Sequence, residues 1–327
     1  MGKPKVEQRR KSKLLQRSSK PSKPSSENSQ IETSPGVVTS KPAAKNFELK
    51  SGLYIIATPI GNARDITLRA LETLHTADVI VCEDTRVTAK LLSIHDIARP
   101  LMAYHEHNAE RAGPKIIERL QHGEIVALVS DAGTPLISDP GFRLIQACVQ
   151  KNIYTTHLPG ASSVLTSLVL AGLPTDRFLF AGFPPNRTGK RINFFDDLRP
   201  IRATLVFLES PKRLAKSLSD MTRVFGPRDA AVGRELTKKF EEIRRGSLSE
   251  LGEHYTQAGA PKGEVTIVVA PPTASETKAP PEEIDRLLKN ALASASLKDA
   301  VSSVVAATGT SKRDVYARAL ELDTRCK

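Results

Sequence analysis

Apolar runs of strand length recur through the first half of the chain, and each ends in a turn of polar residues or glycine. Runs of this length and composition predict strands that are buried on both faces. A helical pattern follows each run, and this alternation predicts a parallel sheet of the α/β class. The predicted strands are residues 53–58, 79–82, 101–104, 125–129 and 154–158, and the helices after them reach about residues 75, 93, 121, 149 and 171.

The pattern changes at Ala171-Gly172-Leu173-Pro174-Thr175, where glycine and proline interrupt the last of these helices. Shorter apolar runs follow, with helical stretches between only some of them. This texture favours a second α/β domain with more antiparallel pairing. We predict its strands at residues 178–183, 204–208, 230–234, 242–248 and 265–270.

A stretch rich in Pro, Ala, Thr and Lys then leads to a C-terminal region of helical periodicity. Its predicted helices, 282–295, 297–308 and 312–322, include a glycine turn at Thr308-Gly309-Thr310-Ser311. Helix, glycine turn and helix resemble a helix-turn-helix, and a small packing bundle is the common alternative. The predicted domains are a tail (1–46), two α/β domains (47–171 and 172–272), a linker (273–281) and a helical region (282–327).

Residues 1–46 carry much of the positive charge of the chain. They hold eight lysines and three arginines against three glutamates, and the whole chain has a net charge of +12. The stretch is rich in Ser and Pro and almost free of aromatic residues, which predicts disorder. Two interpretations stay open, a basic arm that contacts nucleic acid and a solvated extension without a role; a transit peptide is a less favoured third.

Composition argues against several classes of protein. No apolar run reaches 18 residues and none follows the N-terminus, so we predict neither a transmembrane helix nor a secretory signal. Cys82, Cys148 and Cys326 have no metal or redox spacing, which indicates reduced thiols and a cytoplasmic protein. Neither G-x-G nor G-x-x-x-x-G-K occurs, which disfavours nicotinamide enzymes and P-loop NTPases.

Three loops at predicted strand ends suit a ligand. They read TPIGN at Thr58–Asn62, SDAGTPLISDPG at Ser130–Gly141 and PGASS at Pro159–Ser163. Ligands of open α/β sheets collect at the carboxyl ends of strands, where glycine permits close approach to the backbone and helix N-termini offer free N–H groups. The plain structural alternative for the central loop is a tight connection with Asp139 as the helix N-cap.

Candidate acids and bases follow two further strands. Glu83 and Asp84 come directly after residues 79–82, and the alternative is a helix cap with an ion pair between Asp84 and Arg86. The loop His105-Glu106-His107-Asn108 holds two histidines, but no third ligand at a fixed spacing supports a metal site. His105 remains a candidate for the same edge of the sheet.

The clearest basic loop of the folded part is PPNRTGKR, residues 184–191. Its cations, Arg187, Lys190 and Arg191, suit contact with phosphate groups, and the alternative is a solvated surface turn. Lys312-Arg313, at the start of the last predicted helix, suits nucleic acid in the same way.

Seven short motifs occur in a fixed order along the chain. They are Thr58–Asn62, Glu83–Arg86, Ser130–Gly141, Pro159-Gly160, Glu209-Ser210, Arg234–Lys238 and Lys262–Glu264. Together they resemble the bacterial small-subunit ribosomal RNA methyltransferases of the tetrapyrrole methylase (class III) superfamily. Each motif alone is weak, but the ordered set is specific and spans about residues 53–272; the last helices resemble the family's helix-turn-helix extension. Sirohaem and precorrin methylases carry G-G-D-P in the central loop, where this chain has Ala132-Gly133-Thr134-Pro135.

The resemblance implies a two-domain α/β fold that binds S-adenosyl-L-methionine in a cleft between the domains, without a metal. It implies methylation of a cytidine ribose 2′-hydroxyl in the decoding centre of 16S ribosomal RNA, as naked RNA or as the small ribosomal subunit, by a homodimer away from membranes. Glu209 and Glu264 are weaker candidates for the cleft. The cofactor contacts carried over by position are Pro59, Gly61, Gly133, Thr134, Pro135, Leu136, Ile137 and Ser162.

The implied reaction needs little covalent chemistry from the protein, because the transferred methyl group is already activated and must mainly be aligned with the attacking oxygen. A ribose hydroxyl is a poor nucleophile near neutral pH, so a general base would help. The candidates are Asp84 and Glu83, followed by His105 and Asp131. The predicted RNA contacts are Arg86, Arg187, Lys190, Arg191, Lys312 and Arg313.

Two functions of other kinds stay open. One is a methylase of a tetrapyrrole of the uroporphyrinogen or precorrin type, an anionic substrate that basic residues would also bind. The tail and the helix-turn-helix argue against it. A non-catalytic RNA-binding protein on the same scaffold is the other, and the intact loops at four strand ends argue against that.

Overall fold

A computed structural model describes residues 49–273 and 281–322. The predicted tail (1–46) and most of the predicted linker lie outside the described residues. No helix in the two described ranges is long and apolar enough to cross a membrane.

The first sheet has five parallel strands in the order β3-β2-β4-β1-β5. Because all strands run the same way, their carboxyl ends meet at one edge, with Ile56 beside both Val129 and Leu158. The parallel sheet predicted from the alternating pattern is therefore confirmed. The strands are β1 (Gly52–Ile56), β2 (Val79–Cys82), β3 (Leu101–Ala103), β4 (Ile125–Val129) and β5 (Thr155–Leu158).

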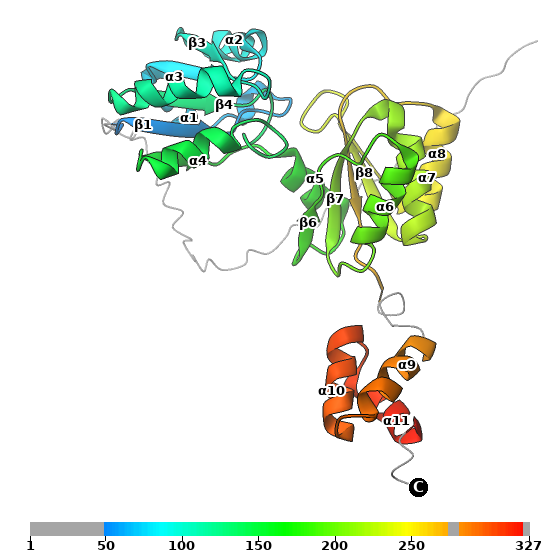
Figure 1. The fold of residues 1–327 in the computed structure, drawn as a ribbon. Coiled ribbons are helices and arrows are strands. Elements are labelled where there is room, and N and C mark those ends of the chain that lie inside the picture. The colour runs from blue at the N-terminus through cyan, green and yellow to red at the C-terminus, as the bar shows by residue number, and fades with distance from the viewer. Residues whose placement is uncertain (1–48, 274–280, 323–327) are drawn as a thin grey trace, which may run out of the picture. The chain divides into compact units, whose positions relative to one another are not determined.

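Helices cover both faces of this sheet, which explains why its strands are continuously apolar (Figure 1). Alternate residues such as Leu53 and Val126 pack on one side, and Tyr54 and Ala127 pack on the other. The helix that the sequence predicts from Asp65 to about residue 75 begins later: a short 3-10 turn at Ala63–Asp65 precedes α1, which begins only after the Thr67 N-cap. The helices are α1 (Leu68–Thr76), α2 (Thr85–Ile94), α3 (Ala109–Gln121) and α4 (Phe142–Gln150).

The second sheet has the order β6-β7-β10-β8-β9. Only β6 and β7 pair in parallel, and the other three pairs are antiparallel, as the sequence pattern predicts. Phe195, Phe207 and Met221 lie in the core on one face, beneath the helices α6 (Thr188–Leu198), α7 (Leu214–Phe225) and α8 (Leu248–Ala258). The strands are β6 (Phe178–Phe180), β7 (Thr204–Glu209), β8 (Asp229–Arg234), β9 (Glu242–Ser247) and β10 (Val265–Val269).

Helix α5 (Ser163–Ala171) follows the last strand of the first sheet but packs against the second. Val164 and Leu168 contact Val206 and Val268, so α5 covers the face opposite α6, α7 and α8. The helix ends at Gly172, whose φ of 74° is the left-handed conformation that glycine adopts without strain. The chain therefore passes from one sheet to the other through the Leu158–Ser163 loop, where the last predicted ligand loop lies.

The C-terminal region is a small bundle of three helices, α9 (Pro281–Leu292), α10 (Leu297–Thr308) and α11 (Lys312–Leu322). Leu288, Val301 and Val315 are buried in its core. Gly309, at φ 64°, ends α10, and the short turn after it leads into α11. This is the helix, glycine turn and helix that the sequence indicates.

Candidate functional site at the edge of the first sheet

The loops after β1, β4 and β5 are joined at the carboxyl edge of the first sheet. Thr58 and Gly133 exchange two backbone hydrogen bonds of 2.9 Å each. The Thr58 hydroxyl donates to the Ser130 carbonyl at 3.0 Å, and the Thr134 hydroxyl donates to the Ala161 carbonyl at 3.3 Å. The three loops singled out in the sequence therefore form one connected structure.

The central loop holds an unusual backbone. Gly133 has a φ of 84°, and Leu136 and Ser138, which are not glycines, have φ values of 72° and 69°. A left-handed conformation costs a non-glycine residue about 1–2 kcal/mol, and such strain gathers at functional sites. A Cβ on Gly133 would lie 3.4 Å from the Ile60 side chain, an ordinary van der Waals contact, so the positive φ rather than lack of space favours glycine here.

The predicted cofactor residues lie on these three loops and differ in exposure. Gly133 and Pro135 are buried, whereas Gly61 is exposed and Ile137 is 48% exposed, which is unusual for a side chain of its size in a rigid loop. The Ser162 hydroxyl accepts the Leu165 N–H at 3.4 Å as the N-cap of α5. Pro59, Thr134, Leu136 and Ser162 are half-buried.

Asp84 has a clear structural role. Its side chain accepts the Arg86 backbone N–H at 2.8 Å as the N-cap of α2, and it pairs with the Arg86 guanidinium at 2.6 Å. These hydrogen bonds to Arg86 hold the pKa of the Asp84 carboxyl down at about 2. A carboxylate with so low a pKa is a weak base, although it is ionised throughout the neutral range.

Three other carboxyl groups at this edge are perturbed in the opposite direction. Burial raises the pKa of Asp139 to about 6, and the charges of Glu83 and Asp131 add to the effect. Burial also raises the pKa of Glu83 and of Asp131. Within residues 49–273 and 281–322 no lysine or arginine forms an ion pair with any of the three. Asp131 accepts the Asp84 backbone N–H at 3.1 Å, so the loops after β2 and β4 also touch.

His105 lies at the end of β3 beside this group, and its charge acts to lower the pKa of Glu83. Its Nδ1 atom is buried without a hydrogen-bond partner among the described residues. Asn108 fixes the loop by accepting the His105 N–H at 2.9 Å and donating to the Ala103 carbonyl at 3.0 Å. In the part of the chain that is described, no three His, Cys, Asp or Glu side chains gather as a metal site would require.

Loops of the second domain approach this edge. The Asn62 N–H donates to the Thr237 hydroxyl at 3.1 Å, and a Cβ on Gly61 would lie 2.4 Å from the Lys238 Cγ atom. Gly61 is therefore required by the approach of another segment of the chain. A Cβ on Gly182, in the loop after β6, would lie 3.9 Å from the Ser138 hydroxyl.

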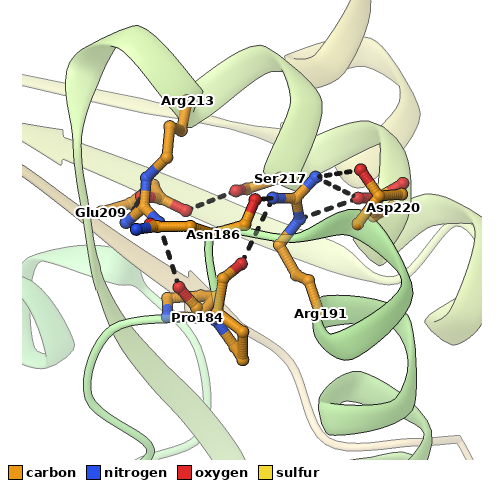
Figure 2. A network of polar contacts seen from close by, with 9 residues as sticks. Pro184, Asn186, Arg191, Glu209, Arg213, Ser217 and Asp220 are labelled. Atoms are coloured by element: carbon orange, nitrogen blue, oxygen red, sulfur yellow. Dashed lines mark hydrogen bonds and ion pairs between the residues drawn. The ribbon is translucent and has the colours of Figure 1, made fainter.

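The predicted basic loop, residues 184–191, is helical from Thr188 on, where α6 begins, and an internal network drawn in Figure 2 anchors it. Arg191 is only 3% exposed and reaches Asp220 at 2.5 Å and 2.8 Å, the Pro185 and Asn186 carbonyls, and the Thr188 hydroxyl. All the guanidinium donors of Arg191 are used inside the protein. The prediction that Arg191 contacts phosphate therefore does not fit its position, because a buried guanidinium with satisfied donors has none to offer.

Glu209, a weaker candidate for the cleft, belongs to the same network. Its carboxylate is buried, pairs with Arg213 at 2.5 Å and accepts the Ser217 hydroxyl (Figure 2). Glu264 instead pairs with Lys238 at 2.9 Å. The remaining predicted RNA contacts, Arg86, Arg187, Lys190, Lys312 and Arg313, are all exposed.

Sequence reasoning assigned Asp139 only the role of a helix cap, but the N-cap of α4 is Gly141. The signal that could have identified Asp139 is its place in a glycine- and proline-rich loop that also holds Asp131. A hollow of about 460 Å³ lies elsewhere, between α3 and α4, where residues such as Ile117, Ala147 and Lys151 line it. None of its lining residues belongs to the predicted site.

Comparison with known proteins agrees with this architecture. Residues 52–252 match the family model of the tetrapyrrole (corrin/porphyrin) methylases, and residues 278–323 match that of the RsmI C-terminal HTH domain. A ribosomal RNA small subunit methyltransferase I of Mesorhizobium japonicum is 50% identical over 275 residues, which cover 84% of this chain and 93% of the relative. The protein of that name from Halalkalibacterium halodurans is 41% identical over 275 residues, 82% of this chain and 94% of its own.

Solved structures show the same fold at low sequence identity. A diphthine synthase matches 67% of this chain and 89% of its own with a TM-score of 0.53 at 18% identity. A cobalt precorrin-4 methyltransferase matches 67% and 94% with a TM-score of 0.50, also at 18% identity. With both sheets and the C-terminal helices matched, the chain belongs to the tetrapyrrole methylase family, in the branch of the ribosomal RNA small subunit methyltransferase I proteins.

Proposed function

We propose that this protein transfers a methyl group from S-adenosyl-L-methionine to the 2′-hydroxyl of a cytidine ribose in the decoding centre of 16S ribosomal RNA, in the cytoplasm. The observation that carries this proposal is the 50% identity, over 275 residues, with a protein named as a ribosomal RNA small subunit methyltransferase. The alternative substrates, tetrapyrroles, would not account for the match of residues 278–323 to a helix-turn-helix model.

The edge of the first sheet fits the cofactor. When bound, S-adenosyl-L-methionine supplies a methyl group that its sulfonium already activates. Gly133 lets the backbone approach a ligand closely, and the strained Leu136 and Ser138 fix the loop around it. The exposed Ile137 side chain offers an apolar surface to the ligand. Pro59, Gly61, Thr134, Pro135 and Ser162 complete the set that we propose, and no metal is needed.

Glu83 is the general base that we propose. It is half-buried, and its raised pKa makes its carboxylate a better proton acceptor than Asp84, whose pKa lies at about 2. Burial is the main cause of the raised pKa of Glu83, and the charges of Asp131 and Asp84 add to it, while His105 acts in the opposite direction. A base that accepts the proton of the ribose hydroxyl in the transition state contributes about 10²- to 10⁴-fold to the rate.

RNA binding is assigned to the exposed cations of two segments. Arg187 caps α6 and Lys190 lies in its first turn, which the buried Arg191 anchors to the preceding loop, and Lys312 and Arg313 begin α11. Arg86 adds a cation at the edge itself, although its guanidinium also pairs with Asp84. Phosphate contacts of this kind position RNA without reading its sequence.

A second copy of the chain is the partner that we propose for the outer face of α5. Leu165 is 52% exposed and Val169 is 74% exposed, four residues apart on one side of a helix that is apolar all round. Exposed apolar faces of this kind mark interfaces. Sedimentation equilibrium should give the mass of a dimer, and the mass of a monomer would contradict this part of the proposal.

One experiment tests the reaction. The protein and tritiated S-adenosyl-L-methionine are incubated with one acceptor in each reaction. The acceptors are small ribosomal subunits, naked 16S RNA and uroporphyrinogen. Label should enter ribosomal RNA. The labelled RNA should resist alkaline cleavage at one nucleotide, because a 2′-O-methyl group blocks the attacking hydroxyl. Label in uroporphyrinogen alone, or in no acceptor, would contradict the proposal.

A further inference from the structure

The loop between β8 and β9, residues 235–241, is exposed at its tip but held firmly at its base. Lys238 pairs with both Glu235 and Glu264 at 2.9 Å. The Glu235 N–H donates to the Glu264 carbonyl at 3.0 Å, and the Thr237 N–H donates to the Glu241 carboxylate at 2.6 Å. These bonds fix the path of the loop, so its tip has a defined position.

The backbone of this loop is strained. Glu235 has a φ of 49° and Thr237 has a φ of 64°. Positive φ is uncommon for any residue other than glycine, and for a β-branched residue such as threonine it is a true outlier. Strain persists only where the surrounding structure enforces it, and it gathers at functional sites.

The same loop contacts the proposed cofactor site. The Thr237 hydroxyl accepts the Asn62 N–H at 3.1 Å, and the Lys238 Cγ atom lies only 2.4 Å from where a Cβ on Gly61 would be. The strained threonine is therefore the residue that touches the loop after β1. Its unusual conformation serves to bring residues 235–241 against this loop.

The tip carries an aromatic ring that the described residues leave largely exposed. Phe240 is 63% exposed, and the Lys239 Nζ atom lies 5.7 Å from the centre of its ring. Leu236, four residues earlier, is only 6% exposed and anchors the loop in the protein. Single exposed apolar residues are common, but this one stands on a rigid, strained loop beside Gly61 and next to an exposed lysine.

We propose that Phe240 stacks against an unpaired base of the RNA substrate, next to the nucleotide that is methylated, while Lys239 contacts a neighbouring phosphate. Proteins that recognise RNA commonly bind single-stranded loops and ends, and they hold the unstacked bases there on aromatic side chains. The ring of Phe240 replaces the stacking that the substrate loses. This inference rests on the proposed function and names a residue that recognises its substrate.

The test compares Phe240→Ala, Phe240→Tyr and Phe240→Leu with a control, Phe178→Ala, which removes another exposed ring (43% exposed). Equilibrium binding to small ribosomal subunits and methyl transfer are measured separately. Phe240→Ala should raise Kd and KM for subunits about 5- to 100-fold, the range that base stacking on aromatics gives. Affinity for S-adenosyl-L-methionine and the slope of log Kd against log salt should stay unchanged, because the ring carries no charge. Phe240→Tyr should bind like the wild type.

Two results would overturn the inference: equal binding by Phe240→Ala and Phe178→Ala, or full binding by Phe240→Leu, since leucine keeps an apolar contact but cannot stack. A wild-type protein that transfers no methyl group would count against the proposed function instead. Even then, the binding measurement would decide the role of Phe240.

Discussion

The edge of the first sheet and the basic loop of Figure 2 are both rich in charged residues, but they treat charge in opposite ways. In the network of the loop, Asp220 and Glu209 each have an arginine partner at 2.5 Å. At the edge, Asp139 is partly buried beside other acids, and its pKa rises to about 6. Paired charges hold a structure together, whereas crowded and unpaired acids keep a proton within reach of neutral pH.

Residues that are adjacent in the sequence also differ in whether their charge is paired or buried. Glu83 and Asp84 are adjacent, yet Asp84 caps a helix and pairs with Arg86, while burial raises the pKa of Glu83. Arg191 is buried, while Lys190, one residue earlier, is exposed. The type of a residue therefore indicates which roles it can have, and its neighbours in the folded structure determine which of them it has.

The largest difference in activity is expected between substitutions of the two adjacent acids, Glu83 and Asp84. Glu83→Gln should lower kcat about 10²-fold or more, because an amide cannot accept the ribose proton, with affinity for S-adenosyl-L-methionine retained. Asp84→Asn is the matched control: asparagine caps helices as well as aspartate does, so kcat should change little. Steady-state methyl transfer at saturating substrate gives kcat for both variants. An equal loss in the two would return the base to Asp84 and break the comparison.

The cations of the basic loop should likewise have separate roles, one in stability and the others in RNA binding. Arg191→Ala leaves Asp220 without its partner and should lower the free energy of unfolding by about 3–5 kcal/mol, measured in urea. The double variant Arg187→Ala and Lys190→Ala should leave unfolding unchanged. It should instead raise Kd for RNA and reduce the slope of log K against log salt by about 1.4–1.8, since each phosphate contact contributes about 0.7–0.9. A stable Arg191→Ala protein with weakened RNA binding would reverse these assignments.

The smallest effect is expected from Asp139. Its raised pKa means that the folded state holds this proton more tightly than the unfolded state, whose aspartates titrate near 3.9. The folded state therefore loses stability as the pH rises from about 4 through about 6. Asp139→Asn removes that loss, so its advantage in Tm over the wild type should grow between pH 4 and pH 7. Asp176→Asn, at an exposed position, is the control. An advantage that is the same at both pH values would mean that Asp139 does not titrate in this window.

Much of the fold could be predicted because burial on both faces produces continuous apolar runs. Residues 125–129 were predicted as a strand, and β4 has those bounds; residues 312–322 were predicted as a helix, and α11 has those bounds. The packing of α5 was less accessible. Its sequence is apolar all round, so the pattern does not say which sheet it covers, and only the contacts of Val164 and Leu168 do.

The candidate site was predictable in place but not in detail. The loops of the site could be located from the ends of the predicted strands, since parallel strands bring their carboxyl ends together. The sequence could not show that Arg191 pairs with Asp220, 29 residues away, or that burial and the charges of Glu83 and Asp131 raise the pKa of Asp139. Such pairings depend on three-dimensional neighbours, and no spacing along one strand or helix encodes them.

The central claim, that the loop after β4 binds S-adenosyl-L-methionine, is tested most directly by calorimetry on two matched glycine variants. Gly133 and Gly123 have nearly equal φ values, 84° and 86°, so valine imposes similar backbone strain at both. A Cβ on Gly123 would meet nothing within 4 Å, and this glycine lies in the turn between α3 and β4. The account predicts that Gly123→Val binds S-adenosyl-L-methionine like the wild type, whereas Gly133→Val, still folded by its thermal transition, gives no binding heat. Equal affinity in the two folded variants would contradict it.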